Sequence, residues 1–315
     1  MSATTANVRG GRAAPTYRFG RELPPRLLGF VMNLPTLVVL AVVLAYPIYY
    51  AGYLSLHKVS LVQLRSGIFP FIGLDNYEKV LTDPLFLLSL ANTMLFTAFV
   101  VTVEVVAAVA IAILINQQDV WTSRITRFLI LLPYAVPPIA NGLIWSFIYN
   151  GKTGFLNRLL YSVGAIDSPI DWTSNADTAL YVVAVPYIWR TLPFAILLTH
   201  AALQGISKEL YEAASVDGAG GWHRFVHITL PLLMPVIVVL LVLRTSFAVA
   251  VFDEILAITQ GGPGDATWVA SWYSYKKGFA PPFDIGAGAA SAFILALIVA
   301  ALALFYVKLL YRRVD

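Results

Sequence analysis

The sequence has no cysteine, and it has few charged residues for its length. The absence of cysteine excludes disulfide bonds, thiolate metal sites and cysteine nucleophiles, although it does not fix the compartment. Only 12% of the 315 residues are charged, about half of the roughly 25% found in soluble domains. Hydrophobic residues make up 59% of the chain. This composition predicts an all-α protein that crosses a membrane several times.

Other missing patterns exclude further classes of function. The net charge of +4 is spread along the chain, with no basic domain that would hold a nucleic acid. Residues 150–153 resemble the end of a phosphate-binding loop, but Ser146 stands where that loop needs its first glycine. We therefore expect no nucleic-acid partner, no ATP site or other cofactor, and no enzymatic activity in this chain. No metal site is expected either, because the four histidines are not spaced as metal ligands are. They are His57, His200, His223 and His227.

Six segments are long and apolar enough to cross a bilayer as helices, since each has about 20 or more mainly apolar residues. The predicted spans are residues 28–54, 88–115, 127–149, 178–203, 229–253 and 285–311. Several prolines lie inside these spans, and we expect kinks at those positions.

The distribution of lysine and arginine predicts which side of the membrane each connection faces. With the N-terminus inside, twelve of the 21 basic residues lie in cytoplasmic segments, seven lie in outer connections, and Arg190 and Arg244 lie within spans. Basic residues are enriched on the cytoplasmic side of membrane proteins. Both termini are therefore predicted to be cytoplasmic, with an arginine-rich tail at residues 1–27, a transmembrane domain at residues 28–315 and a cytoplasmic connection at about residues 204–228.

This connection between the fourth and fifth spans predicts a short amphipathic helix. Apolar residues lie on one side, whereas Glu209, Glu212 and the small pair Ala213-Ala214 make another surface. Gly218 is placed where a helix must end, and glycine adopts the positive φ that such a turn requires. An alternative is an ordinary amphipathic helix that lies on the bilayer surface.

The order and spacing of residues in this connection resemble the EAA loop of binding-protein-dependent ABC-transporter permeases, where a short helix docks into an ATPase subunit. The residues that carry this resemblance are Glu212, Ala213, Ala214, Asp217, Gly218, Ile228, Leu230 and Pro231. A wider set of short motifs over residues 46–280 resembles the carbohydrate-uptake class of these permeases. It comprises Tyr46-Pro47-Ile48, Ser55-Leu56, Gly73-Leu74-Asp75-Asn76-Tyr77, Asn92-Thr93, Trp189, Pro193-Phe194, Asp217-Gly218, Phe252-Asp253, Thr259 and Gly261-Gly262-Pro263.

The resemblance implies the type I ABC importer fold in the inner membrane of a bacterial cell. It also implies a heteromeric importer with a second permease, two subunits that bind ATP and Mg²⁺, and an extracytoplasmic solute-binding protein. The coupling loop would be residues 204–228. The maltose-type relatives have extra N-terminal spans and a large outer domain that this sequence does not match, so their detailed architecture is not carried over.

Three ionisable residues lie within predicted spans, where charge is costly and commonly functional. They are Glu104, Arg190 and Arg244. A rise of about 1.5 Å per residue from the outer ends places Glu104 and Arg190 at the most similar depths, so these two residues are predicted to pair. Arg244 is expected to line the pathway or to contact Asp253, Glu254 or backbone carbonyls.

Two polar stripes are candidate walls of a substrate pathway. In span three, Tyr134, Pro138, Asn141, Trp145 and Tyr149 recur at helical spacing. Aromatic and amide groups suit a sugar, although an aromatic belt at the membrane interface explains Trp145 equally well and is preferred for Tyr149. In span five, the aligned residues are Ser246, Ala250 and Asp253.

The predicted function is that of a permease subunit of an ABC importer for a sugar or sugar derivative, embedded in membrane lipid. Two arginines against one glutamate in the spans leave an anionic sugar derivative or a polyol phosphate open as the substrate. A stand-alone secondary transporter is the alternative from another class. That alternative would need inverted halves and a midplane carboxylate, and only Glu104 comes near this requirement.

Overall fold

The computed structural model describes residues 24–310 and divides the chain into two compact units, up to Tyr50 and from Ala51 onward. The described residues form helices and loops, with one isolated β-bridge between His57 and Phe71. Most of the predicted cytoplasmic tail lies outside the described residues, as do Arg312 and Arg313 near the C-terminus.

The first unit contributes the first predicted span. Helix α1 (Pro25–Leu40) continues through a π-helical turn, η1 (Ala41–Ala45), into α2 (Tyr46–Ser55), whose last turn belongs to the second unit. Pro25 opens α1, where a missing amide proton costs nothing. The continuous stretch Leu27–Ser55 is 29 residues long and apolar enough to cross a membrane, so the span predicted at residues 28–54 is confirmed.

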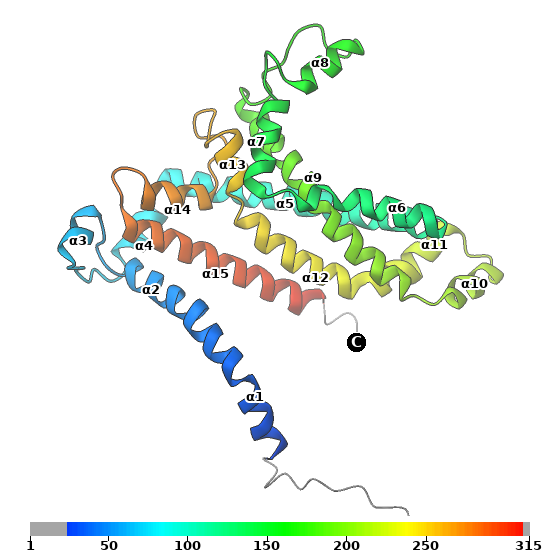
Figure 1. Ribbon diagram of the computed structural model, residues 1–315, viewed down its shortest axis with the longest axis horizontal. Coiled ribbons are helices and arrows are strands. Elements are labelled where there is room, and N and C mark those ends of the chain that lie inside the picture. Colours follow the sequence, from blue (N-terminus) through cyan, green and yellow to red (C-terminus); the bar gives the residue numbers. More distant parts are fainter. Residues whose placement is uncertain (1–23, 311–315) are drawn as a thin grey trace, which may run out of the picture. The chain divides into compact units, whose positions relative to one another are not determined.

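The second unit is a bundle of long helices, with short helices at both ends and others over its middle (Figure 1). Its elements are α3 (Leu61–Ser66), α4 (Asp75–Leu81), α5 (Pro84–Asn116), α6 (Val120–Leu131), η2 (Pro133–Ala135), α7 (Pro138–Ile148), α8 (Phe155–Ser162), α9 (Ala176–Gln204), α10 (Lys208–Val216), α11 (Gly221–Arg224), η3 (Phe225–Thr229), α12 (Leu230–Val249), α13 (Asp253–Ile258), α14 (Ala270–Phe279) and α15 (Ile285–Leu310).

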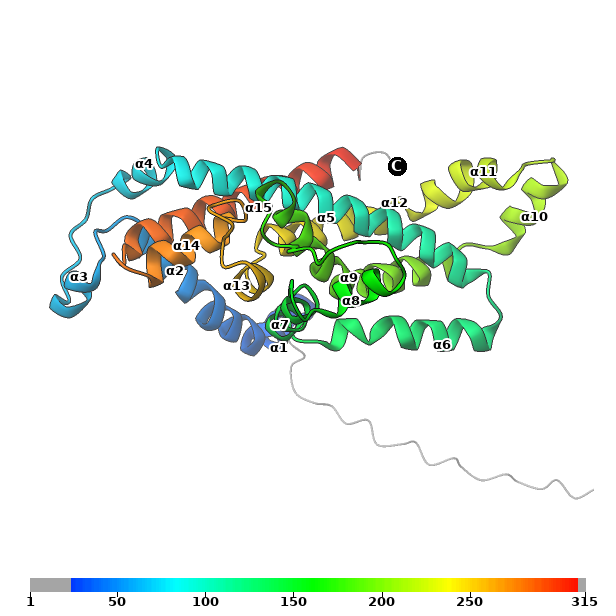
Figure 2. The same cartoon turned by 90° about the horizontal axis from the view of Figure 1, so that it is seen from above.

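The core of this unit is built on α5, which packs along α9 and α12. Helix α15 packs against α12 and α14. Figures 1 and 2 show α10 and α11 at one end of the bundle and α3, α4 and α14 at the other. Helices α5, α9 and α15 satisfy the length and hydropathy needed for spanning, which confirms the second, fourth and sixth predicted spans.

Span three is broken rather than kinked. Helix α6 and η2 meet α7 at an angle of 94°, with Val136 extended between them. Pro137 and Pro138 follow directly. A proline lacks the amide proton and forces the preceding residue out of helical geometry, so two in succession end the helix. The expectation of a single face from Tyr134 to Tyr149 is therefore wrong, because Tyr134 lies before the break.

The fifth predicted span is confirmed, since Gly221–Ile258 is long and apolar enough to cross a membrane, but its helix is interrupted. Helix α12 stops at Val249, and after three non-helical residues a separate helix, α13, begins at Asp253. Asp253 thus does not share a helical face with Ser246, which corrects the predicted second wall. The Ser246 hydroxyl donates to the Val242 carbonyl of its own helix at 2.7 Å.

Tyr149 replaces a hydrogen bond that proline removes from α9. Pro186 lies inside α9 and has no amide proton to donate to the Val182 carbonyl one turn earlier. The Tyr149 hydroxyl donates to that carbonyl at 3.1 Å. Tyr149 is buried, so its preferred assignment to an interfacial aromatic belt is wrong.

Asp83 links the start of α5 to α14. Its carboxylate caps α5 by accepting from the Leu85 amide at 2.9 Å, and it also accepts from Tyr273 Oη at 2.7 Å and lies 2.9 Å from Lys277 Nζ. Burial raises the pKa of Asp83, but the hydrogen bonds from Tyr273, Lys277 and Leu85 outweigh it and hold the pKa below its ordinary value.

This linkage predicts a loss of stability in acid. A carboxylate whose pKa is lower in the folded state stabilises the fold above its unfolded pKa of about 4, and the contribution disappears as the pH falls through the folded pKa. We expect Asp83→Asn to unfold at a lower temperature than wild type at neutral pH and to show a weaker decline below about pH 4. Thermal unfolding against pH measures this. Asp167→Asn, at an exposed carboxylate, is the control, and identical pH profiles for wild type and Asp83→Asn would contradict the prediction.

Candidate functional site

A polar cavity of about 290 Å³ lies among η2, α7, α9, α12 and α13. It brings together four of the seven predicted pathway residues, which come from three different predicted spans. The lining residues are Tyr134, Pro138, Tyr187, Arg190, Thr191, Arg244, Phe247, Ala250, Val251, Phe252, Asp253 and Glu254.

Arg244 on this cavity is paired with Glu104 of α5. Arg244 Nε lies 2.6 Å from one carboxylate oxygen of Glu104, and Arg244 Nη2 lies 2.8 Å from the other. Thr191 Oγ1 also donates to this carboxylate. Glu104 is 0% exposed and Arg244 is 4% exposed. The pair is a bidentate ion pair in the core, the geometry in which arginine binds a carboxylate most strongly.

Arg190 is paired with a different carboxylate. Its Nε lies 3.2 Å from Glu254 Oε1 of α13. Asn141 of α7 donates to the same oxygen at 3.4 Å and to the Pro186 carbonyl at 3.0 Å. The predicted Glu104–Arg190 pair is therefore wrong. Asn141 is fully buried and fastens α7 to α9 and α13 instead of lining the cavity.

Depth along a helix does not by itself fix a partner, because the rotation of the helix about its axis decides where each side chain points. Helix α9 does reach Glu104, but it does so through Thr191. Successive helical residues point about 100° apart, so the neighbouring Arg190 side chain is directed toward α13. The sequence suggested Glu254 as a contact of Arg244, whereas the structure pairs Glu254 with Arg190 and Arg244 with Glu104.

Asp253 lines the same cavity and has no side-chain hydrogen bond or ion pair within residues 24–310. Tyr134 stacks on Phe194 at a ring separation of 6.0 Å and presents its ring to the cavity, together with Phe247 and Phe252. Trp145 lies elsewhere, against Tyr149 and Trp189, and Ser246 does not line the cavity either. The site thus offers one unpaired carboxylate beside aromatic surface, the groups that bind hydroxyls and stack on a sugar ring.

The predicted coupling loop begins with a capped helix. Ser207 accepts from the Glu209 amide at 3.2 Å at the start of α10. Gly218 has a φ of +81°, and the Ala219 amide donates to the Ala214 carbonyl at 2.9 Å, which closes the end of the helix. The expected positive φ at Gly218 is confirmed.

One side of helix α10 is exposed to solvent, and the other side forms hydrogen bonds to neighbouring elements. Glu212, Ala213 and Asp217 are exposed, as is Val216 at 88%, whereas Ala214 is half-buried. On the inner side, the Tyr211 and Thr229 hydroxyls lie 2.9 Å apart. Arg224 Nη1 donates to Ser215 Oγ at 2.8 Å. These bonds make α10, α11 and η3 one connected structure.

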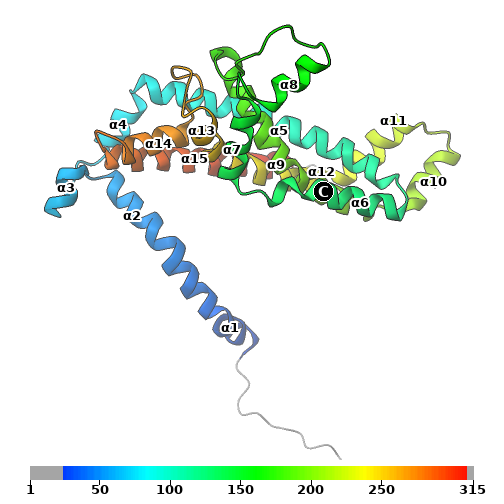
Figure 3. The ribbon, with the colours of Figure 1, turned by 45° about the horizontal axis from the view of Figure 1, so that its top comes forward.

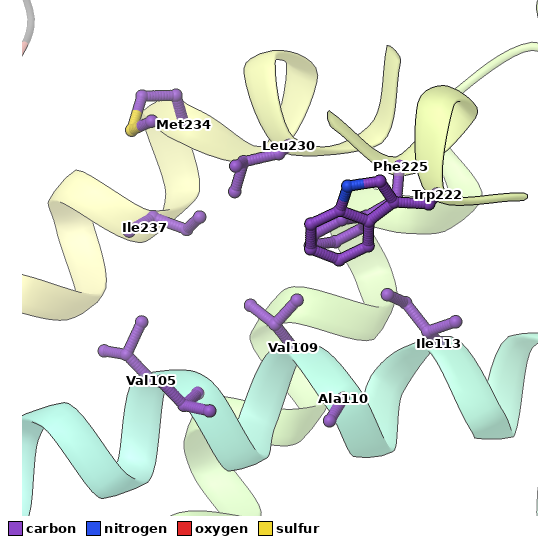
Figure 4. A pocket seen from close by; sticks show the side chains of 10 residues that line it. Val105, Val109, Ala110, Ile113, Trp222, Phe225, Leu230, Met234 and Ile237 are labelled. Carbon is purple, nitrogen blue, oxygen red and sulfur yellow. The ribbon is translucent and has the colours of Figure 1, made fainter. Parts of the chain in front are cut away.

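The remaining residues of the predicted loop motif lie where this structure joins the bundle. Ile228 is in η3, and Leu230 and Pro231 open α12. Leu230 and the exposed Trp222 line an apolar cavity of about 520 Å³ against α5, and Figure 4 shows Val109 and Ile113 on its opposite wall. Phe225 and Leu230 also pack against an apolar cluster that includes Val109 and Ala112 of α5, while Glu212 and Asp217 remain exposed.

The sequence of this chain matches a known protein family. Residues 104–315 match the family described as the binding-protein-dependent transport system inner membrane component. The chain belongs to this family. The predicted resemblance to ABC permeases is confirmed, and so is the assignment to the inner membrane. The predicted coupling-loop motif and the polar cavity both lie within the matched residues.

Similar proteins span nearly the whole permease. It is 35% identical over 289 residues to the trehalose/maltose transport system permease protein MalF of Thermococcus litoralis, covering 91% of this chain and 95% of that one. It is 34% identical to the sulfoquinovosyl glycerol transport system permease protein SmoG of Agrobacterium fabrum, covering 89% of each. It is 31% identical to the sn-glycerol-3-phosphate transport system permease protein UgpA of Yersinia pestis, covering 91% and 95%.

A solved structure has the same fold. A chain of a bacterial alginate ABC transporter, in complex with an alginate pentasaccharide-bound periplasmic protein, superposes with a TM-score of 0.77. The two chains are 22% identical, and the match covers 92% of this permease and 96% of that chain. The predicted all-α ABC importer permease fold is thus confirmed.

Proposed function

We propose that this permease forms, with a second and different permease subunit, the membrane pathway of an ABC importer for a neutral sugar. A solute-binding protein delivers the sugar from outside, and two partner subunits bind ATP and Mg²⁺ and hydrolyse the ATP. Both termini and residues 204–228 face the cytoplasm. Support comes from the family, from the names of the relatives and from the exposed, capped helix α10.

The balance of charge in the polar cavity favours a neutral substrate over an anionic one. Each arginine that lines it has its own carboxylate, Glu254 for Arg190 and Glu104 for Arg244. Asp253 adds a further carboxylate without a described partner. An anionic substrate would have to displace a buried carboxylate, which is costly, whereas sugar hydroxyls donate to Asp253 without disturbing either pair.

The coupling step follows from the rigidity of the loop. A partner ATPase binds the exposed face of α10. The hydrogen bonds of Tyr211 and Arg224 transmit the resulting movement of α10 to η3 and α12. Helix α12 holds Arg244, which lines the polar cavity. Movement of α10 therefore reaches the cavity through one continuous helix.

Uptake into proteoliposomes tests this proposal. The complete transporter, reconstituted with its ATPase and binding protein, is expected to take up trehalose or maltose in preference to sn-glycerol 3-phosphate, and only with ATP. Asp253→Asn is expected to lower uptake by about tenfold or more, because hydrogen bonds to charged groups contribute about 1.5–3 kcal/mol each. Co-purification of the subunits reports assembly separately.

Asp265→Asn is the matched control, since Asp265 lies in an exposed loop and does not line the cavity. Preferential uptake of sn-glycerol 3-phosphate would refute the neutral-sugar assignment. Sugar uptake by the permease alone, without an ATPase, would instead indicate a secondary transporter.

A further inference from the structure

A second polar cavity, of about 490 Å³, lies at the end of the bundle that carries α10. The end of α5, the start of α6, the end of α9 and α10 surround it, and Figures 2 and 3 show these four segments at that end. Its lining residues are Ile115, Asn116, Gln118, Val120, Ser123, Arg127, His200, Leu203, Gln204, Ile206, Lys208 and Tyr211. It shares no residue with the cavity proposed for the sugar.

This cavity is basic, whereas at the first cavity the two arginines are outnumbered by the carboxylates of Glu104, Asp253 and Glu254. Arg127 and Lys208 line it, and none of the described residues around it is a carboxylate. Arg127 donates from Nε to the Ser123 carbonyl at 3.1 Å, and neither Arg127 nor Lys208 forms an ion pair within residues 24–310. In the sugar cavity every arginine is paired, so two unpaired cations here distinguish this site.

His200 adds a further polar side chain to the lining of the cavity. It is only 3% exposed, it lines the cavity, and it has no hydrogen-bond partner among the described residues. The ring nitrogens of His200 are not among the fully buried unpaired side-chain atoms of the described residues, so they are open to the cavity or to solvent and can meet a ligand. The side chains of Asn116, Gln118 and Gln204 provide further amide donors around the same space.

The surroundings of the cavity have the marks of a membrane–water boundary. Val120 and Trp121 at the start of α6 are more than two-thirds exposed. The Arg124 guanidinium lies 5.4 Å from the centre of the Trp121 ring. Exposed tryptophan beside arginine is typical of the interface where lipid headgroups lie.

We propose that this cavity binds a phosphate group through Arg127, Lys208 and His200. Arginine and lysine are the side chains that bind phosphate most effectively, and basic pockets between membrane helices bind anionic lipid headgroups on the cytoplasmic side. The phosphate comes either from an anionic phospholipid or from solution. Because Lys208 begins α10, an occupied site joins that helix to α5, α6 and α9. The proposal stands independently of the transported substrate.

Thermal unfolding of the full-length permease in an uncharged detergent tests the site. The probes are short-chain phosphatidylglycerol, short-chain phosphatidylcholine and inorganic phosphate. We expect phosphatidylglycerol or inorganic phosphate to raise the melting temperature of the wild type more than phosphatidylcholine does. The double variant Arg127→Gln/Lys208→Gln should need about tenfold or more of the effective probe for the same shift.

Two further variants separate binding from folding. Arg124→Gln removes a cation one turn away, outside the cavity, and should respond as the wild type does. Arg127→Lys keeps the charge and should retain most of the response. A response to phosphatidylglycerol alone identifies a lipid headgroup, and a response to inorganic phosphate identifies a soluble ligand. No response in the wild type, equal responses in the wild type and the double variant, or an equal loss in Arg124→Gln would overturn the proposal.

Discussion

Replacing Glu104 alone by leucine is expected to lower the free energy of unfolding by about 3–5 kcal/mol, because it leaves Arg244 charged and buried without a partner. The carboxylate accepts two hydrogen bonds from Arg244 and a third from Thr191, and both members of the ion pair are nearly inaccessible. Arg244→Met alone should be about as harmful, since it leaves the carboxylate behind. The loss is measurable by denaturant titration in detergent or as a fall in thermal unfolding temperature.

The double variant Glu104→Leu/Arg244→Met tests whether the losses in the single variants come from the unpaired charge that each leaves behind. Removing both charges leaves no unpaired buried ion, so the double variant should be more stable than either single variant. Lys79→Gln supplies the control, because Lys79 pairs with Asp284 while remaining 60% exposed, and exposed pairs contribute about 1 kcal/mol or less. Additive losses in the double variant would show that the two residues do not depend on each other.

Gly218→Val is expected to reduce both ATPase co-purification and ATP-driven uptake by about tenfold or more, which rests on the proposed coupling role of α10. Gly218 has a φ of +81°, a conformation that costs an ordinary L-residue roughly 1–2 kcal/mol and a β-branched residue more. Valine there would favour opening the end of α10, where Ala219 bonds to Ala214. A penalty of about 1.4 kcal/mol corresponds to a tenfold change in an equilibrium.

Gly220→Val provides the matched comparison for Gly218→Val. Gly220 has a φ of −67° and a ψ of 167°, which valine adopts readily, and an added Cβ would meet no atom within 4 Å. Gly220→Val should therefore retain the ATPase, whereas Gly218→Val loses it while remaining in the membrane. Equal co-purification with both variants would mean that the shape of this turn does not matter for coupling.

The sequence predicted features that depend on local chemistry. Hydrophobic length located the spans to within a few residues at α5, α9 and α15. The positive φ at Gly218 was predicted because glycine is the residue that accepts it without strain. The Glu-Ala-Ala pattern and its distance from Gly218 and Pro231 identified the family, which the match over residues 104–315 confirmed.

The same reasoning failed where a residue had to be placed relative to another helix. Pro137 and Pro138 predicted a kink, but the 94° turn also depends on where α7 packs against α9 and α13. The helix break within span five was missed because residues 250–252 are apolar and continue the hydrophobic pattern between α12 and α13.

By itself, then, the sequence determined that this is a membrane permease with several spans and a short helix, ended by Gly218, between its fourth and fifth predicted spans, because composition, hydrophobic length and glycine geometry act over a few residues. Only the tertiary structure decided that Glu104 pairs with Arg244, that Glu254 pairs with Arg190, and that Asp253 is left beside them. Pairing across a bundle depends on the tilt, rotation and ends of separate helices. A shift of one residue turns a side chain by about 100°, so spacing along one chain does not fix which charges meet.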